Sequence, residues 1–479
     1  MDEIAAHNKR LHAACGGNRK ILAKFVANEF IHGGKAKMIT KLKQSFLKNR
    51  TVKNAGWLIG EKIAQALINL IVSILTTRFL GPSNYGLINY GTAYTAFFMS
   101  LCTLGINSIL VKEFIDKKYD EGTILGTTIF LRMVSSALSI GIIFCVVSFI
   151  DADEPTTIIV TLLCSLGLFF NVFEAFNYWF QSRLQSKVTA IASFIAYVIT
   201  AGYKIVLLIL KKDVQWFAFA TSVDYICIAV VLLICYRKYN GSKLKFSPAC
   251  AKHLLGKSYH FILTGMIVAI YGYVDKFMLK HMVSETETGY YATAVTVATM
   301  WCFVLAAIIN SVYPSITASY KAGNTALFEK RNKQLYAIVF YLSLFVSSVF
   351  TIFGKYAILI IYGRSYLPAA APLRIATWYV AFSYLGVARD AWVVCENKQK
   401  YLKYIYLSSC AANVVLNSIF IPIWGASGAA FASLITQMLT IFAAACIKPL
   451  RPNAKLMLDA ILLKDLLPKK EKQSEQIHK

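Results

Sequence analysis

The chain has 479 residues, of which 57% are hydrophobic and 15% are charged, and its formal net charge at pH 7 is +26. A soluble domain is closer to half apolar and a quarter charged, so the composition excludes an ordinary soluble protein. A large positive net charge indicates nucleic-acid binding when the basic residues form a patch on a soluble domain. Here the basic residues flank apolar runs, and we expect no nucleic-acid partner.

Twelve long apolar runs, separated by short polar breaks, cover the chain from about Lys53 to Lys448. A helix needs roughly 20 apolar residues to cross a bilayer, and open sheet edges cannot exist in lipid. The sequence therefore predicts an all-α polytopic membrane protein with about 12 transmembrane helices. The expected spans are 53–77, 87–111, 123–150, 156–178, 188–210, 214–236, 259–281, 290–312, 334–354, 372–395, 401–422 and 427–448.

The basic residues predict the orientation of these helices. With the N-terminus inside, the inner connections carry 37 of the 50 Lys and Arg residues, and the outer loops carry 6. Positive charge stays on the cytoplasmic side of a membrane, so we expect both termini to be cytoplasmic. A missed or added span would put the later loops out of phase with this count.

The same pattern divides the chain into five parts. They are a basic cytoplasmic N-terminal segment (1–52), an N-lobe of six helices (53–236), a basic cytoplasmic linker (237–258), a C-lobe of six helices (259–448) and a basic cytoplasmic tail (449–479). Met38 opens a compact basic lead-in to the first span, and we interpret residues 1–37 as a dispensable tail or an over-long start. The stretch LMLDAILLKDLL in the tail predicts a surface helix.

Two pairs of segments indicate an internal duplication of about six spans. They are FLGPSNYG (79–86) with MVSETETG (282–289), and FAT (219–221) with FAS (431–433). The offsets are 203 and 212 residues, and each member of a pair has the same place in its half. Because six is an even number, the two copies share one orientation, related by an axis normal to the membrane. Such halves enclose a central site and rock against each other.

Two spans carry adjacent ions of opposite charge. Glu61 and Lys62 lie in the first span, and Asp275 and Lys276 lie in the seventh. Ionisable groups inside a membrane are costly and face a protein interior or an aqueous cavity. Neighbours in sequence do not face each other on a helix, so we expect one member to line the cavity and the other to reach an adjacent helix. The alternative is that these groups only hold helices together.

Other ionisable residues lie in or near later spans. Three of them are candidates for a functional role, but snorkelling at a helix end is the competing interpretation: Lys204, Asp224 and Glu174. Arg389 and Asp390 lie deep in the tenth span. Carboxylates such as Glu61 and Asp275 are candidates to bind a proton or Na⁺. The candidate residues of a substrate or ion pathway are Glu61, Lys62, Lys204, Asp275, Lys276, Arg389 and Asp390.

The sequence shows no catalytic motif. It lacks G-x-S-x-G, a Walker loop and H-E-x-x-H. Its 11 cysteines are scattered singly, mostly within apolar runs, and its 7 histidines form no cluster with metal-ligand spacing. We therefore expect a protein that is not an enzyme, with no cofactor and no structural metal.

Four strings resemble Wzx-type polysaccharide flippases of the multidrug/oligosaccharidyl-lipid/polysaccharide exporter superfamily. They are RFLGPSNYGLINY (78–90), VDKFMLKHMVSETETGYYATA (274–294), IIYGRSYLPAAAPLRI (360–375) and NVVLNSIFIPIWGASGAAFAS (413–433). Each string is modest alone, but the four in this order are specific. The resemblance runs from about residue 50 to 448.

The resemblance implies two six-helix lobes around a central cavity that opens alternately to the two sides of a bacterial cytoplasmic (inner) membrane. It implies that an oligosaccharide on undecaprenyl diphosphate passes from the inner to the outer leaflet for cell-surface polysaccharide biosynthesis. Lys62, Lys204, Lys276 and Arg389 would neutralise the diphosphate. The expected partners are membrane lipids, a polysaccharide polymerase, glycosyltransferases and a coupling proton or Na⁺.

Alternative functions stay open. A multidrug exporter of the same superfamily would favour an acidic cavity, against which the lysines argue. A lipid II flippase typically has two further spans. A membrane-embedded polysaccharide-assembly enzyme would need a large outer loop or a catalytic motif. A scaffold without transport activity is compatible with the sequence.

Overall fold

The computed structural model describes the backbone of residues 50–464, and the side chains of residue 68 and of residues 70–464 except 403. Residues 1–37, interpreted above as a dispensable tail, lie outside the described residues. The α-helices are α4 (Arg50–Thr103), α5 (Asn107–Asp116), α6 (Glu121–Ile150), α7 (Pro155–Ser165), α8 (Gly167–Asn171), α9 (Ala175–Ser182), α10 (Ser186–Ile209), α11 (Val214–Lys238), α12 (Pro248–Met282), α13 (Glu285–Thr299), α14 (Cys302–Lys321), α15 (Thr325–Tyr362), α16 (Ala370–Cys395), α17 (Leu402–Cys446) and α18 (Arg451–Ile461).

These helices account for the twelve crossings that the apolar runs predict. By length and composition, nine helical stretches within the described residues are able to cross a membrane. The stretches that contain α4 and α17 each supply two crossings, because those helices kink at Gly81 (φ +73°) and Gly425 (φ +53°). Residues with a side chain rarely adopt a positive φ, so glycine fits both turns. Helix α16 adds one more crossing of 26 residues, about 39 Å long.

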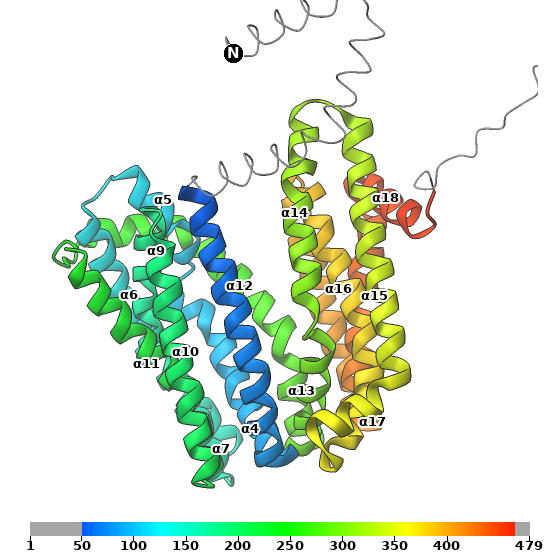
Figure 1. Cartoon of the computed structure of the whole chain (residues 1–479), viewed down its shortest axis with the longest axis horizontal. Coiled ribbons are helices and arrows are strands. Elements are labelled where there is room, and N and C mark those ends of the chain that lie inside the picture. Colours follow the sequence, from blue (N-terminus) through cyan, green and yellow to red (C-terminus); the bar gives the residue numbers. More distant parts are fainter. Residues whose placement is uncertain (1–49, 465–479) are drawn as a thin grey trace, which may run out of the picture.

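The helices form two bundles, seen side by side in Figure 1. We call α4–α11 the N-terminal bundle and α13–α17 the C-terminal bundle. Two large hydrophobic clusters each lie in one half of the chain, around Trp179 in the first and Tyr336 in the second. A third, around Tyr366, is also contacted by Ile74 and Tyr85 of α4. Helix α18, where the tail predicts a surface helix, packs on α15 and buries Leu456 and Met457.

Helix α12 crosses from one bundle to the other (Figure 1). It begins at Pro248, inside the segment 237–258 expected as a linker, and Ser247 caps its first turn. Near this end, Glu113 of the N-terminal bundle accepts hydrogen bonds from His253 and Lys257 at 3.0 and 2.8 Å. Farther along, α12 packs on both α4 and α17. It therefore contacts both halves of the molecule.

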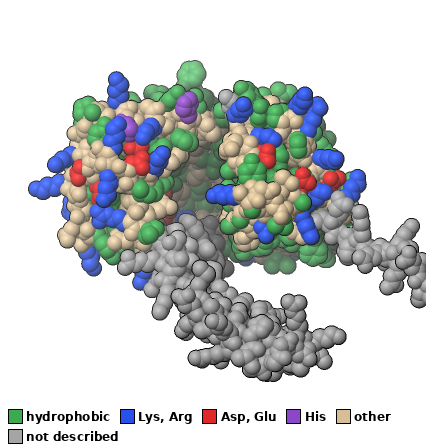
Figure 2. Space-filling model, turned by 90° about the horizontal axis from the view of Figure 1, so that it is seen from above, with side chains coloured by type: hydrophobic (Ala, Val, Ile, Leu, Met, Phe, Trp, Pro, Cys, Tyr) green, Lys and Arg blue, Asp and Glu red, His purple; other side chains and the backbone are tan. Residues whose placement is uncertain are grey.

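The two ends of the molecule differ. The connections after α5, α9, α11 and α14 lie at the upper end of Figure 1, and Lys and Arg are abundant there. We call this the basic end. Figure 2 looks onto it and shows a hollow between the two bundles. The positive-inside rule predicts that the basic end faces the cytoplasm, so the hollow opens toward that side.

Candidate functional site

Opposite the basic end, the two bundles meet along α4 and α13. Gly86 of α4 and Gly289 of α13 lie so close that a Cβ atom on either glycine would overlap the other helix. The Ser83 hydroxyl donates to the Glu285 carboxylate at 2.8 Å. We call this contact, together with the next three turns of α4 and the end of α12, the closed-end seam.

A second contact joins the C-terminal bundle to the same region. Tyr366, which is fully buried, donates its hydroxyl to the Thr77 carbonyl at 2.7 Å. The Arg78 guanidinium also donates to the Ile360 carbonyl. Thr77 and Arg78 lie just before the kink at Gly81, and Ser83 lies just after it. The turn between the first two crossings is therefore attached to the C-terminal bundle on both sides of the kink.

A cluster of ionisable groups lies in the closed-end seam. Lys280 of α12 is 7% exposed, and its Nζ lies 2.6 Å from Asp151 and 2.5 Å from Glu154, both in the α6–α7 connection. The Tyr90 hydroxyl donates to Asp151 at 2.8 Å and also lies 2.8 Å from Nε2 of His281. Because Lys280 has two carboxylate partners, its charge is compensated, and the cluster joins α12 to the N-terminal bundle.

Glu154 lies in a connection, outside the membrane-spanning helices. Burial disfavours its charged form, but hydrogen bonds from Lys280 and Thr157 outweigh that effect and lower the pKa of the Glu154 carboxyl below its usual value. Thr157 donates to it at 2.6 Å. The carboxylate therefore stays charged at neutral pH and keeps its contact with Lys280.

Lys276 lies one helical turn before Lys280, on the side nearer the basic end. Its Nζ donates to the Asn89 side-chain carbonyl of α4 at 2.9 Å and lies 5.3 Å from the centre of the Tyr273 ring. Among the described residues it forms no ion pair. A cation with a neutral partner in the membrane interior is costly unless an anion joins it. An anion beside Lys276 would compensate its charge.

The neighbouring Asp275 faces the other way. It is 5% exposed and accepts hydrogen bonds from Asn417 at 2.6 Å, from Ser433 at 2.8 Å and from Tyr291. Asn417 also donates to Asn413 at 3.1 Å, while its own carbonyl oxygen is buried without a hydrogen-bond partner. We call these five residues the Asp275 cluster. It places oxygen atoms around a buried carboxylate whose hydrogen-bond partners, among the described residues, are all neutral.

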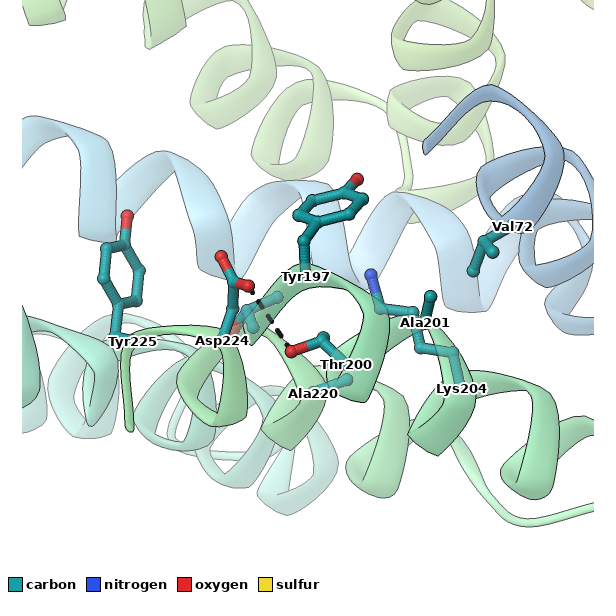
Figure 3. A pocket seen from close by; sticks show the side chains of 9 residues that line it. Val72, Tyr197, Thr200, Ala201, Lys204, Ala220, Asp224 and Tyr225 are labelled. Atoms are coloured by element: carbon teal, nitrogen blue, oxygen red, sulfur yellow. Dashed lines mark hydrogen bonds between the residues drawn. The ribbon is translucent and has the colours of Figure 1, made fainter. Parts of the chain in front are cut away.

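Lys204 lies elsewhere, in a cavity of about 230 Å³ within the N-terminal bundle. Figure 3 shows Lys204, Asp224 and the two tyrosines extending from α10 and α11 on the same side. The Thr200 hydroxyl is 3.4 Å from Asp224. We call this space the N-terminal cavity. It is lined by Val72, Tyr197, Thr200, Ala201, Lys204, Ala220, Thr221, Asp224 and Tyr225.

The remaining candidates are not part of these groups. Arg389 of α16 is completely buried, and its Nη1 donates to the Thr440 carbonyl of α17 at 3.1 Å, so it joins two helices of one bundle. Asp390 follows it on the same helix. Glu61 and Lys62 lie on α4, but their side chains lie outside the described residues. The described candidates thus occupy several places and do not form one cluster.

The family of the chain follows from its sequence as a whole. The model of the polysaccharide biosynthesis protein family matches residues 51–319, which is more than half of the chain. The chain belongs to this family. No curated protein sequence matches it.

Solved structures share the fold of this family member. An inward-facing multidrug resistance transporter of the MATE family and MOP superfamily has a TM-score of 0.63 at 13% identity, over 82% of this chain and 96% of that one. The lipid II flippase MurJ, in an inward closed conformation, has a TM-score of 0.64 at 14% identity, over 85% and 91%. An outward-facing MATE transporter scores 0.55 at 15% identity, over 87% and 98%. The chain is thus a multi-pass membrane protein with the fold of transporters and flippases.

Sequence reasoning missed the ion cluster of the closed-end seam. It assigned no role to Lys280, Asp151, Glu154 or Tyr90. One signal was available, because the 151–154 loop has three acidic and no basic residues. An acidic loop on the side where Lys280 ends its helix predicts an ion pair between them.

Proposed function

We propose that this protein is a flippase that moves an oligosaccharide linked to undecaprenyl diphosphate across the bacterial cytoplasmic membrane for cell-surface polysaccharide biosynthesis. Membership of the polysaccharide biosynthesis protein family and the transporter fold support this proposal. The substrate combines a lipid, a dianionic linker and a polar sugar. A protein that moves it needs a cationic site away from bulk lipid, between parts that can separate.

The observation that carries the proposal is the position of Lys276. It lies between the two bundles, it is half-buried, and its hydrogen-bond partner Asn89 is neutral. A diphosphate at this position would gain a charge-assisted hydrogen bond in a medium of low dielectric constant. Lys280, four residues away, is already neutralised by Asp151 and Glu154. Lys276 is therefore the better anion ligand of the two.

The Asp275 cluster is the proposed site of the coupling ion. A proton or Na⁺ would add the positive charge that the neutral partners of Asp275 do not supply, and the unpartnered Asn417 carbonyl offers another oxygen. Asp275 and Lys276 are adjacent on α12, so a rotation of this helix moves both. Binding of the coupling ion and binding of the diphosphate would then bias the same helix.

Alternating access requires the closed-end seam to separate while the basic end closes. The contacts that must break include the packing of α4 on α13 and the hydrogen bonds Ser83–Glu285 and Lys276–Asn89. A diphosphate that draws Lys276 away from Asn89 removes one of them. The ligand would in this way favour the state in which the seam is open, because it binds that state more tightly.

Deletion of the gene tests the proposal. We expect lipid-linked repeat units to accumulate in the cytoplasmic leaflet, where an enzyme added from outside cannot reach them, while surface polysaccharide falls. Complementation with the wild-type protein should restore export. Normal surface polysaccharide with no accumulated intermediate would reject the function.

Variants at Lys276 connect that function to the site. Lys276→Ala should reduce export about tenfold or more, since it removes a charge-assisted hydrogen bond, and Lys276→Arg should retain part of it. Lys252→Ala, at an exposed position on the same helix, is the matched control. Accumulation of lipid II or sensitivity to organic cations in the deletion strain would favour the two other exporters of the superfamily.

A further inference from the structure

The N-terminal cavity contains charged and aromatic groups that the anion site at Lys276 does not use. Its lining includes one lysine, one aspartate, two tyrosines and two threonines, contributed mainly by α10 and α11. In Figure 3 the Tyr197 ring, the Asp224 carboxylate and the Lys204 ammonium all extend into the same space, and Val72 of α4 lies across from them. A lysine and an aspartate on membrane-spanning helices are costly and mark a candidate functional position.

The hydrogen-bonding state of the lining indicates spare capacity. The Thr221 hydroxyl donates to the Ala218 carbonyl at 2.7 Å, and the Thr200 hydroxyl lies 3.0 Å from the Ala196 carbonyl. The hydroxyl groups of Tyr197 and Tyr225, in contrast, form no hydrogen bond with any residue that the structure describes. Tyrosine rings combine an apolar face with a polar tip, so they can contact the C–H face and the hydroxyls of a ring ligand.

The charges of the cavity select the kind of ligand. Lys204 and Asp224 together contribute no net charge, so a diphosphate would meet the carboxylate and an organic cation would meet the ammonium. A neutral polyol avoids both conflicts, since its hydroxyls accept from Lys204 and donate to Asp224.

The volume limits the size of the ligand. Pockets for drug-sized ligands measure about 300–1,000 Å³, whereas this cavity has about 230 Å³. It accommodates one sugar ring and not an oligosaccharide. The remaining sugars of a larger ligand would have to lie outside it.

We propose that the N-terminal cavity is a subsite for one neutral hexose or N-acetylhexosamine ring of the transported lipid-linked oligosaccharide. This inference rests on the proposed function and adds to it the part of the substrate that the N-terminal bundle recognises. Lys276 binds the diphosphate, and Tyr197, Lys204 and Asp224 bind one sugar. The subsite favours lipid carriers that bear a sugar over bare carriers.

Binding of two lipid probes to the purified full-length protein tests the subsite. The probes are undecaprenyl diphosphate and the same lipid carrying one N-acetylglucosamine or one glucose. The wild-type protein should bind a sugar-bearing probe more tightly than the bare lipid. Tyr197→Leu, Lys204→Met and Asp224→Asn should each weaken that binding about tenfold, the scale of one or two lost hydrogen bonds, and leave binding of undecaprenyl diphosphate unchanged.

A matched control and a second variant make the outcomes decisive. Tyr356→Leu removes a tyrosine that is 62% exposed on α15, and it should alter neither affinity. Ala201→Leu fills the cavity without removing a polar group and should weaken only the sugar-bearing probe. Equal loss of both probes, or no loss of either in these variants, would overturn the subsite while leaving the proposed function intact. A wild-type protein that binds neither probe would overturn both.

Discussion

Gly86 of α4 and Gly289 of α13 contact each other through a two-fold relation between the halves of the chain. A Cβ atom on Gly86 would lie 1.8 Å from the Glu285 carbonyl oxygen, and one on Gly289 would lie 2.0 Å from the Pro82 carbonyl oxygen. Pro82 and Glu285 are separated by the same 203 residues as Gly86 and Gly289. Each half therefore presents the same surface to the other, as in the isologous contact of a symmetric dimer.

Substitution of either glycine should open the closed-end seam. Gly86→Ala places a methyl group where the backbone of α13 now lies, and because backbone cannot rotate away, the helices must separate. Overpacking of this kind costs about 1–3 kcal/mol. We expect a longer distance between spin labels at Ala152→Cys and Ser365→Cys, which lie at this end on different bundles, in a variant lacking the exposed Cys145 and Cys446.

Gly141→Ala is the control for this experiment. Gly141 lies in helix α6, and a Cβ atom there would meet nothing within 4 Å. It should leave the distance between the labels unchanged and increase helix propensity slightly. An unchanged distance in Gly86→Ala and Gly289→Ala would contradict the role of this contact in closing the seam.

Removal of the Lys280 ammonium should destabilise the same seam by a different route. Lys280→Met retains most of the side-chain volume but leaves the Asp151 carboxylate buried without its cation. Breaking a buried ion pair in this way costs about 3–5 kcal/mol. We expect a lower Tm and a longer distance between the same two labels, because Asp151 regains water when the bundles separate.

A second substitution separates the lost charge from lost packing. Asp151→Asn in the Lys280→Met background removes the unpaired carboxylate and should recover part of the lost stability. Lys252→Met, at an exposed position near the start of α12, should change neither Tm nor distance. Equal effects of the single and double variants would show that packing, and not charge, holds this part of the seam.

The sequence predicts the helices better than it predicts the contacts between them. The twelve apolar runs predict the crossings, including the two each in α4 and α17, because an apolar run is a local signal in the chain. The 203-residue offset places Gly86 and Gly289 in equivalent positions. The sequence does not predict that these two glycines touch, since contact depends on how the copies are arranged around their axis.

The sequence likewise predicts some features of the candidate site and not others. Adjacent charges on one helix predict that Asp275 and Lys276 point to different surroundings, and the structure places Asp275 against α13 and α17 and Lys276 against α4. The role of Arg389 as a contact between α16 and α17 has no local signal. The pairing of Lys280 with the 151–154 loop also joins residues more than 120 positions apart, and such distances leave no periodic pattern.

The Glu154 contact should be insensitive to pH in the neutral range. Its pKa is lowered by the donors Lys280 and Thr157, so the stability that it contributes is present above the ordinary Glu pKa of about 4.3 and is lost as the pH falls through the lower pKa of the folded protein. Between pH 5 and pH 8 the distance between the labels at the closed end should depend on pH no more in the wild-type protein than in Glu154→Gln, which retains the neighbouring His281. Opening within this range that is abolished by Glu154→Gln would contradict the assignment.

Asp275→Asn should abolish the dependence of transport on a proton or Na⁺ gradient. Asparagine has nearly the same shape as aspartate, but it removes the negative charge and replaces one acceptor oxygen with a donor, which leaves a neighbouring donor unpaired at a cost of about 1–3 kcal/mol. In proteoliposomes containing lipid-linked oligosaccharide, a proton or Na⁺ gradient should accelerate the wild-type protein and leave Asp275→Asn unaffected. Asp153→Asn, in an exposed loop, should respond like the wild type. If Asp275→Asn responds fully to both gradients, the coupling ion binds elsewhere, and the Asp275 cluster serves to hold α12 against the C-terminal bundle.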